Sequence, residues 1–277
     1  MTDVGLVGPG RVGRTLAELL PQDRFRLGPV LSRTPTSARR AVREMERGVA
    51  VADCEAFADC NVIVVSVPDE ELPAVVKRFA TARLGGNKKA VLHTSGLHAA
   101  SVFEPLRKRG AAAGSMHPLF VFQRPVPSLA GVHFTVEGDA AAAAAARRLI
   151  RAWNGEFQLV KPNHKIYHSI ARSFLSDLLT GLLEAAVQQM VTGGFSRKRA
   201  YHAVSQILGV ALDDYAHSGR SSRPGPLLSG DVLTIRRQLE TLQRTDTALA
   251  ETYRKAACQT LRTLQNQPDG FAFLRED

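Results

Sequence analysis

Cysteines, long apolar runs and a signal segment are scarce or missing in the sequence, and each absence excludes a class of protein. Only three cysteines occur among the 277 residues, Cys54, Cys60 and Cys258, too few and too scattered for a disulfide framework or a metal knuckle. Apolar runs such as Val62–Val67 fall far short of the roughly 18 residues that a membrane span needs. The N-terminus lacks a basic segment followed by an apolar stretch and a cleavage site, which argues against secretion. We therefore expect a reduced, cytoplasmic protein with no membrane segment.

Acidic residues are also in short supply. The 36 Lys and Arg residues outnumber the 26 Asp and Glu residues, which gives a formal net charge of +10. This excess is spread along the chain, +6 over residues 1–160 and +4 over residues 161–277, without a basic tail or an array of aromatic and basic side chains. Binding to nucleic acid would rest on net charge alone and would depend steeply on salt. We therefore predict no nucleic-acid partner.

The first 160 residues alternate strand-like and helix-like stretches. This alternation predicts an α/β fold with a Rossmann-type, doubly wound and mostly parallel sheet. We expect helices at 12–20, 37–46, 70–80, 99–109 and 139–153, the last capped by Asp139. The expected strands are Val4–Val7, Leu27–Leu31, Val49–Val51, Val62–Val67, Ala90–His93, Ala112–Met116, His133–Val136 and Phe157–Val160.

After Pro162 the pattern predicts an all-α region of three long helices. The first covers about 163–191, the second runs from an N-cap at Ser196 to just before Gly219, and the third runs from about Asp231 to about Gln265. The third would span roughly 50 Å, which suggests that it packs against a partner chain. We expect two domains, residues 1–161 for nucleotide binding and residues 162–277 for substrate binding and dimerisation.

A glycine-rich turn gives the best functional signal. Gly8-Pro9-Gly10-Arg11-Val12-Gly13 follows a predicted strand and opens a predicted helix, the context in which this spacing is typical of dinucleotide binding. The glycines allow a tight turn and a close approach of the backbone to a pyrophosphate at the helix N-terminus. A plain glycine-rich turn is the structural alternative.

The end of the second strand indicates which dinucleotide binds. Sites for NAD place an acidic residue there to bind the ribose 2′-hydroxyl, whereas this strand ends in Ser32-Arg33-Thr34. Arg33 can pair with a 2′-phosphate and Ser32 can donate a hydrogen bond to it, with Arg39 or Arg40 assisting. We therefore predict NADP as the cofactor.

Other strand ends bring further candidates to the same edge of the sheet, where ligands of open α/β sheets bind. Val67 and Pro68 would lie over the cofactor, and Asp69 would cap the next helix. Ser95 and Gly96 follow the fifth strand and His117 ends the sixth. Ser95 would contact the cofactor and, with Gly96, the substrate. His117 is a catalytic candidate, with a purely structural histidine as the alternative.

The first long helix carries candidates for proton transfer. Lys165 and His168 are three residues apart and share a face, and either could protonate the atom that receives a hydride. Ser176 and Asp177 follow two to three turns later and are candidates for substrate binding. Asp231 is a further candidate, with simple capping of the last helix as its alternative. Exposed helix polarity is the alternative for the lysine and the histidine.

Four segments together resemble a family of bacterial proteins that join a Rossmann-like domain to a helical C-terminal domain of unassigned function. They are GPGRVG at 8–13, HTSG at 93–96, SMHPL at 115–119, and KIYH at 165–168 with GPLLSGD at 225–231. The wider group is similar to pyrroline-5-carboxylate reductase, prephenate dehydrogenase and the 3-hydroxyacid dehydrogenases. The resemblance implies an oxidoreductase whose helical domain dimerises and whose substrate lies between the domains.

Two positions depart from this resemblance. Ser176-Asp177 stands where relatives have Ser-Asn, and Ser229 stands where an arginine is expected. In the hydroxyacid relatives a lysine and an asparagine share the catalytic work, and Lys165 matches that lysine by position. The hypothesis is an NADP(H)-dependent oxidoreductase, a homodimer without bound metal, acting on a small C=O or C=N substrate that could carry a carboxylate. The alternative is a non-catalytic NADP-binding sensor or regulatory protein.

Overall fold

The computed structural model describes residues 1–83, 89–123, 126–219, 225–263 and 269–274. The chain forms two compact units, Met1–Ser176 and Asp177–Asp277. The expected division after residue 161 follows the change from strands to helices. The first compact unit runs further, because it includes the first helical segment after the sheet.

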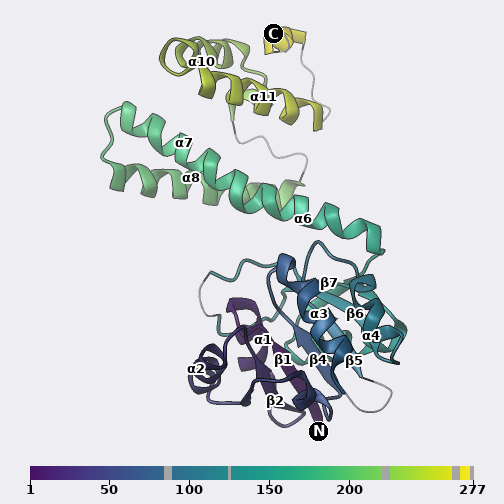
Figure 1. The fold of residues 1–277 in the computed structure, drawn as a ribbon. Helices are drawn as coiled ribbons and strands as arrows, with labels where there is room; N and C mark the ends of the chain where they lie inside the picture. Colours follow the sequence, from purple (N-terminus) through teal and green to yellow (C-terminus); the bar gives the residue numbers. More distant parts are fainter. Residues whose placement is uncertain (84–88, 124–125, 220–224, 264–268, 275–277) are drawn as a thin grey trace. The chain divides into compact units, whose positions relative to one another are not determined.

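The first unit is built on an eight-stranded sheet with the strand order β3-β2-β1-β4-β5-β6-β7-β8 (Figure 1). Strand β7 is antiparallel to β6, and every other pair is parallel. The predicted mostly parallel Rossmann-type sheet is therefore confirmed. Its strands are β1 (Thr2–Val7), β2 (Phe25–Leu31), β3 (Val49–Val51), β4 (Val62–Val65), β5 (Ala90–His93), β6 (Ala112–Pro118), β7 (His133–Gly138) and β8 (Glu156–Leu159).

Helices cover both faces of this sheet. One face packs against α1 (Arg11–Glu18), α2 (Pro35–Met45) and α5 (Ala140–Ala152). The other packs against α3 (Leu72–Thr81), α4 (Glu104–Arg107) and the short 3₁₀ segments η1 (Cys54–Phe57) and η3 (Ala100–Phe103). Each face has its own apolar core, so the central strands are buried on both sides, as their near-continuous apolar sequence requires. The helix expected at 99–109 divides into η3 and α4, since Pro105 lies at the start of α4 and cannot donate a hydrogen bond to the preceding turn.

Two predicted helix caps are wrong. Asp139 stands at the N-cap of α5, but its side chain makes no cap bond. Its carboxylate instead accepts hydrogen bonds from the Ala113 N–H at 2.8 Å and from the Arg107 Nε at 3.0 Å. Asp69 begins the 3₁₀ turn η2 (Asp69–Glu71), and neither η2 nor α3 has a side-chain cap bond. For Asp139, hydrogen bonds to residues from other elements thus replace the expected capping bond.

The helix expected at 163–191 is interrupted. After the 3₁₀ turn η4 (Pro162–His164) come α6 (Lys165–Ser173), a π-helical turn η5 (Phe174–Leu178) and α7 (Leu179–Thr192). A π turn takes one more residue than an α turn, so side chains before and after it do not follow one helical period. The division between the two units falls inside this turn.

The second unit consists of two groups of helices. Helix α7 packs on α8 (Arg197–Ser218), whose predicted N-cap Ser196 accepts a hydrogen bond from the Arg199 N–H. Helix α9 (Pro226–Ser229) and η7 (Asp269–Leu274) pack with α10 (Val232–Thr245) and α11 (Thr247–Thr263) around a separate core.

The single long helix predicted from Asp231 is wrong. It breaks at Asp246, where the backbone is extended (φ −159°, ψ 93°) and the carboxylate accepts a hydrogen bond from the Leu249 N–H at 2.9 Å. Helices α10 and α11 pack on each other, so the argument for a partner chain from a 50 Å helix no longer applies. The predicted end at Gln265 and Pro268 lies outside the described residues. Within the described ranges, no helix is long and apolar enough to cross a membrane.

Candidate nucleotide-binding site and strand-end cluster

The three glycines of the turn after β1 have different surroundings. Gly8 has φ +83°, and a Cβ there would lie 2.4 Å from the carbonyl oxygen of Ser66. A Cβ on Gly13 would lie 2.4 Å from the carbonyl oxygen of Gly8. A Cβ on Gly10 would meet no protein atom within 4 Å, and its φ of −76° is ordinary for any residue. The fold therefore requires the outer two glycines, while the space in front of the middle one is left open.

Helix α1 begins at this open space. Its N-cap is Gly10, which offers no side-chain acceptor, and its first turn contains no acidic residue. The first N–H groups of a helix have no partner within the helix and carry a partial positive charge. The start of α1 can therefore receive an anion.

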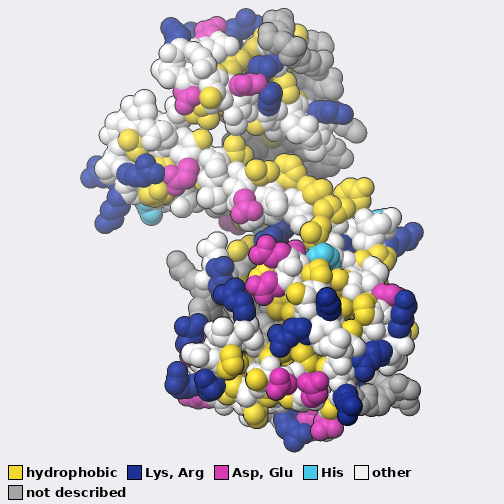
Figure 2. Space-filling view, in the orientation of Figure 1, with side chains coloured by type: hydrophobic (Ala, Val, Ile, Leu, Met, Phe, Trp, Pro, Cys, Tyr) yellow, Lys and Arg dark blue, Asp and Glu magenta, His cyan; other side chains and the backbone are white. Residues whose placement is uncertain are grey.

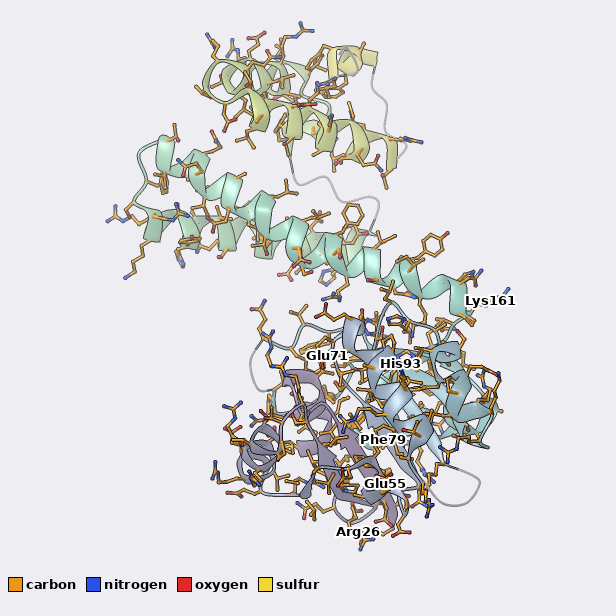
Figure 3. All side chains as sticks on the ribbon, viewed as in Figure 1. Arg26, Glu55, Glu71, Phe79, His93 and Lys161 are labelled. Atoms are coloured by element: carbon orange, nitrogen blue, oxygen red, sulfur yellow. The ribbon has the colours of Figure 1, made fainter. Side chains whose placement is uncertain are left out.

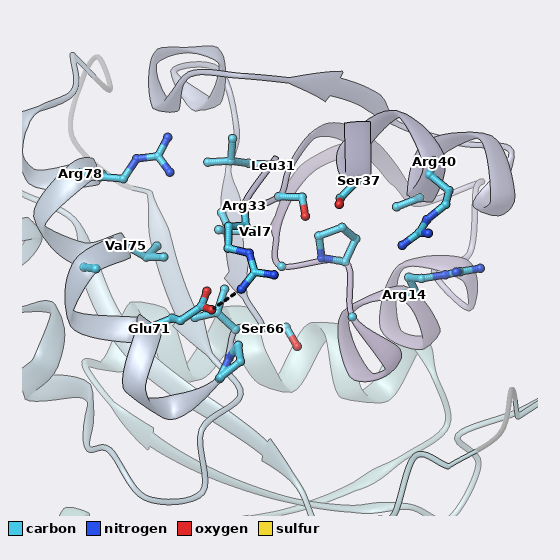
Figure 4. A pocket seen from close by; sticks show the side chains of 18 of the residues that line it. Val7, Arg14, Leu31, Arg33, Ser37, Arg40, Ser66, Glu71, Val75 and Arg78 are labelled. Atoms are coloured by element: carbon cyan, nitrogen blue, oxygen red, sulfur yellow. Dashed lines mark ion pairs between the residues drawn. The ribbon is translucent and has the colours of Figure 1, made fainter. Parts of the chain in front are cut away.

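A cavity of about 520 Å³ opens beside this turn (Figure 4). Seven of the residues predicted to bind the cofactor line it: Gly8, Pro9, Gly10, Ser32, Arg33, Val67 and Pro68. Arg11, Val12, Gly13 and Ser95, which were predicted with them, are not among its lining residues.

The pocket is cationic. Arg33, at the end of β2, is 83% exposed and pairs with Glu71 at 3.6 Å (Nη1 to Oε1), as drawn in Figure 4. Arg14 pairs with Glu44 of α2. Arg40 and Arg78 line the same pocket, whereas Arg39, which was the predicted alternative to Arg40, does not.

Sequence reasoning missed part of this lining. Arg14 stands four residues after Gly10, one helical turn into α1, a signal that could have been found from the helical period. Ser37, Glu71 and Arg78 also line the pocket. Their approach depends on how α2, η2 and α3 pack, which the sequence pattern does not give.

Polar side chains form a row on one face of the sheet, at the ends of β5 and β6. His93 pairs with Ser115, and Ser115 pairs with Glu137 of β7, so their side chains project from the same face. All three are buried, and Figure 3 shows His93 inside the sheet unit. His93 packs against the ring of Phe103 with 5.3 Å between the ring centroids. Burial, together with the charge of Lys165, lowers the pKa of His93 to about 3, so this histidine is neutral.

Lys165 completes this row from α6. Its Nζ donates a hydrogen bond to Ser115 Oγ at 2.6 Å and lies 3.7 Å from Glu137 Oε1. The side chain is only 1% exposed, so the alternative of an exposed helical lysine is wrong. Burial lowers the pKa of Lys165 to about 8, against the raising effect of Glu137. The same Glu137 oxygen accepts a hydrogen bond from the Ala100 N–H at 2.6 Å, which holds the carboxylate in place.

His117 lies two residues after Ser115 in β6, so its side chain projects from the same face of the sheet. Its Nδ1 lies 2.8 Å from the carbonyl oxygen of Thr94, and a carbonyl only accepts, so Nδ1 carries the proton. Its Nε2 is buried without a hydrogen-bond partner among the described residues. Burial lowers the pKa of His117, and the charges of Lys165 and Arg172 add to this against the opposing Thr94 hydrogen bond. His117 is therefore a neutral imidazole with a free acceptor nitrogen.

The segment after β5 is held around this ring. A Cβ on Gly96 would lie 2.8 Å from His117 Nε2, so glycine permits the close approach. The Ser95 Oγ accepts hydrogen bonds from the backbone N–H groups of Leu97 and His98. Ser95 thus shapes the turn, with its own hydroxyl proton left to donate.

The remaining predicted residues have other surroundings. His168 is half-buried, and its Nδ1 has no hydrogen-bond partner among the described residues. Ser176 donates from Oγ to the carbonyl oxygen of Arg172 at 2.8 Å, and Asp177 is exposed in the π turn. Asp231 caps α10 by accepting hydrogen bonds from Thr234, whose hydroxyl and N–H lower the pKa of the carboxyl. The capping alternative for Asp231 is confirmed. No group of His, Cys, Asp and Glu that could hold a metal occurs in the part of the chain described.

Two families match the sequence. Residues 1–118 match the Rossmann-like domain, and residues 132–260 match a domain of unknown function, DUF2520. The chain therefore joins a Rossmann-like domain to a DUF2520 domain, which confirms the resemblance inferred from the four segments. No curated protein matches the sequence.

Several solved structures share the fold. The Thermotoga maritima protein TM1727 is 18% identical with a TM-score of 0.73 over 95% of this chain and 98% of that chain. An imine reductase from Pseudomonas sp. is 19% identical with a TM-score of 0.65 over 95% and 94%. A pyrroline carboxylate reductase from Plasmodium falciparum, solved with NADP bound, is 13% identical with a TM-score of 0.59 over 96% and 98%. At these identities the likeness establishes the fold.

Proposed function

We propose that this protein is an NADP(H)-dependent oxidoreductase that transfers hydride to or from a small C=O or C=N substrate. The observation that carries the proposal is the open space in front of Gly10, at the start of α1 and at the mouth of the cationic pocket. A glycine that the fold does not need, next to unpaired helix N–H groups, suits a pyrophosphate. The three free cysteines fit a reducing, cytoplasmic setting.

The cationic end of the pocket favours NADP over NAD. Arg33 and Arg40 can pair with a 2′-phosphate, and Ser32 and Ser37 can donate hydrogen bonds to it. The nearest carboxylates, those of Glu71 and Glu44, pair with Arg33 and Arg14. The NADP held by the Plasmodium falciparum structure of the same fold supports the same choice.

The nicotinamide supplies the hydride chemistry when bound, and the protein supplies position and electrostatics. His117 is the proposed proton carrier, because its free Nε2 can accept a proton from a hydroxyl or amine and return it in reverse. Lys165 would hold Ser115 and Glu137 in position and place a positive charge near the ends of β5 and β6. His168 is the second candidate for proton transfer. Ser95 and Gly96 would orient the substrate, with Ser176 as a further proposed contact.

A homodimer through the C-terminal helices is part of the proposal. Helices α7 and α8 bury only Val187, Ala200 and Val204 against each other among the described residues. The same helices expose large apolar side chains, including Leu182, Ile207, Val210, Leu212 and Tyr215. Exposed apolar area on this scale is typical of a protein interface.

Calorimetric titration with NADPH and, separately, with NADH tests the cofactor. We expect clear preference for NADPH, and loss of an arginine at the 2′-phosphate should remove it. Arg33→Ala and Arg40→Ala should each weaken NADPH about tenfold or more while changing NADH little. Arg39→Ala is the matched control, since it removes the same charge from an exposed site of α2 outside the pocket lining. Equal weakening of both cofactors would refute the 2′-phosphate assignment, and absence of any binding would refute the function.

A non-catalytic NADP-binding sensor is the second candidate. Asp177 and Ser229, which replace residues expected in the catalytic relatives, favour it, and a fold alone does not confer activity. The contacts of Lys165 add to this, since its amine already pairs with Ser115 and Glu137. Turnover separates the two: a sensor binds NADPH but oxidises it with no keto acid, imine or other carbonyl compound.

A further inference from the structure

A second pocket lies beside the strand-end row, entirely within the sheet unit. Its volume is about 400 Å³. The segment that follows β6 contributes Leu119, Phe120 and Val121, directly after His117 and Pro118. Helix α6 and the following π turn contribute His168, Ala171, Arg172 and Leu175. The helical residues are spaced i, i+3, i+4 and i+7, so they form one stripe.

The buried Lys165 fixes which stripe of α6 faces the sheet. Lys165 stands three residues before His168 and is held by Ser115 and Glu137. Because residues three apart share a helix face, anchoring Lys165 turns His168 and Arg172 toward the end of β6. The lysine thus sets the orientation of the pocket wall.

The pocket wall is apolar over most of its area. Leu119, Phe120, Val121 and Leu175 are 39%, 36%, 45% and 75% exposed, which is high for large apolar side chains lying side by side. Figure 2 shows the gathering of hydrophobic side chains along α6. Such a wall can bury an apolar group of a ligand.

A cation and an unsatisfied nitrogen accompany this apolar wall. The Arg172 guanidinium has no acidic partner within 4 Å in the described part of the chain, and no described residue lining the pocket is acidic. The Nδ1 of His168, which lines the pocket, is buried without a partner among the described residues. Buried polar atoms without partners are rare in native proteins, and a polar ligand would satisfy this nitrogen.

We infer that this pocket binds an organic acid with a bulky apolar body. The carboxylate would pair with Arg172, the apolar body would lie against Phe120 and Leu175, and an oxygen or nitrogen beside the carboxylate would face the Nδ1 of His168. As a statement about the substrate, this rests on the proposed oxidoreductase function. As a statement about binding, it does not.

Three probes separate the parts of this ligand. Phenylpyruvate carries the carboxylate, the carbonyl group and the apolar ring. Phenylacetone has a methyl group in place of the carboxylate, and pyruvate lacks the ring. Binding of each is measured by calorimetry or saturation-transfer NMR, on the protein alone and on the protein saturated with NADPH. We expect phenylpyruvate to bind about tenfold or more tightly than either of the other two.

Matched variants locate the two contacts. Arg172→Met should reduce the affinity for phenylpyruvate to that for phenylacetone, whereas Arg148→Met, at an exposed arginine of α5 outside the pocket, should not. Leu175→Ser should weaken phenylpyruvate several-fold and leave pyruvate unchanged, with Leu159→Ser on β8 as its control. All four sites are exposed or half-exposed, so the fold should persist in each variant.

The outcomes distinguish this inference from the cofactor proposal. Failure of NADPH to bind, with phenylpyruvate still bound through Arg172, would overturn the proposed function and leave the acid site standing. NADPH binding without detectable phenylpyruvate binding at about 1 mM would overturn the acid site alone. Equal affinity for phenylpyruvate and phenylacetone would also overturn it, because Arg172 would then contribute nothing.

Discussion

The two compact units differ in how they satisfy their apolar side chains. The sheet unit buries two continuous cores, one on each face, and also encloses the charged pair of Lys165 and Glu137. In the helical unit, α10 and α11 share a modest core, and α7 and α8 bury three residues against each other. The packing of the sheet unit therefore holds a buried ion pair in place, whereas the α7–α8 pair leaves large apolar side chains exposed.

Breaking the buried ion pair should have the largest effect. Lys165→Met leaves the Glu137 carboxylate buried without a cation, and the free energy of unfolding should fall by about 3 kcal/mol. Urea unfolding measures this, and the added change Glu137→Gln should recover part of the loss. Lys161→Met, at an exposed lysine just before η4, is the control. An unchanged midpoint for Lys165→Met would mean that the pair does not stabilise the sheet unit.

A charge placed on the exposed apolar face of α8 should weaken the proposed dimerisation. Val210 is 73% exposed, so Val210→Lys should leave the fold intact but place a charge in the proposed interface. We expect dimerisation to weaken about thirtyfold or more, as measured by sedimentation equilibrium. Ser205→Lys, on another side of the same helix, is the comparison. A wild-type protein that sediments as a monomer would end the proposal of a dimer.

The glycines of the first turn should separate stability from binding. Gly13→Ala places a Cβ against the Gly8 carbonyl oxygen and should lower the free energy of unfolding by about 1–3 kcal/mol. Gly10→Ala meets no protein atom, and the gain from a less flexible unfolded chain is offset by the poorer N-cap, so the free energy of unfolding should stay within about 1 kcal/mol of wild type while NADPH binding weakens. Thermal unfolding and calorimetry on the same samples test both. Unchanged NADPH affinity in Gly10→Ala would contradict the pyrophosphate site.

The buried, neutral His93 should make the protein less stable as the pH falls. The folded protein holds it neutral down to about pH 3, whereas an unfolded chain protonates histidine near pH 6.5. The unfolded state therefore binds more protons in this window, and stability falls as the pH falls below about 6.5. Removing the group with His93→Leu should reduce that slope by an amount that approaches about 1.4 kcal/mol per pH unit near pH 5, as urea unfolding between about pH 7 and pH 5 can measure. Identical slopes in the two proteins would mean that His93 takes up its proton without unfolding.

Local signals predicted most of the sheet unit. Short apolar runs bounded by turns gave each strand within a few residues, and the glycine spacing located the start of α1. The helical unit was harder, because a break such as the one at Asp246 changes no apolar period. It depends on one carboxylate that caps α11 in preference to continuing the helix.

The site was predicted in its residues more than in its contacts. The shared face of Lys165 and His168 follows from their spacing, but the spacing does not tell that Lys165 lies under the sheet edge and His168 beside an open pocket. Nor does it tell that Glu71 approaches Arg33. Such contacts depend on side chains that meet from distant parts of the chain.

The open space at Gly10 has a practical consequence for anyone who redesigns this sequence. A procedure that scores folding stability alone would accept alanine in place of this glycine, because the structure offers room for the Cβ and a less flexible unfolded chain is stabilising. The product would express, melt near the wild-type temperature and pass every test of foldedness. If the proposed cofactor site is correct, it would also have lost the surface that a dinucleotide approaches, so a screen for improved variants of this protein needs a binding assay from its first round.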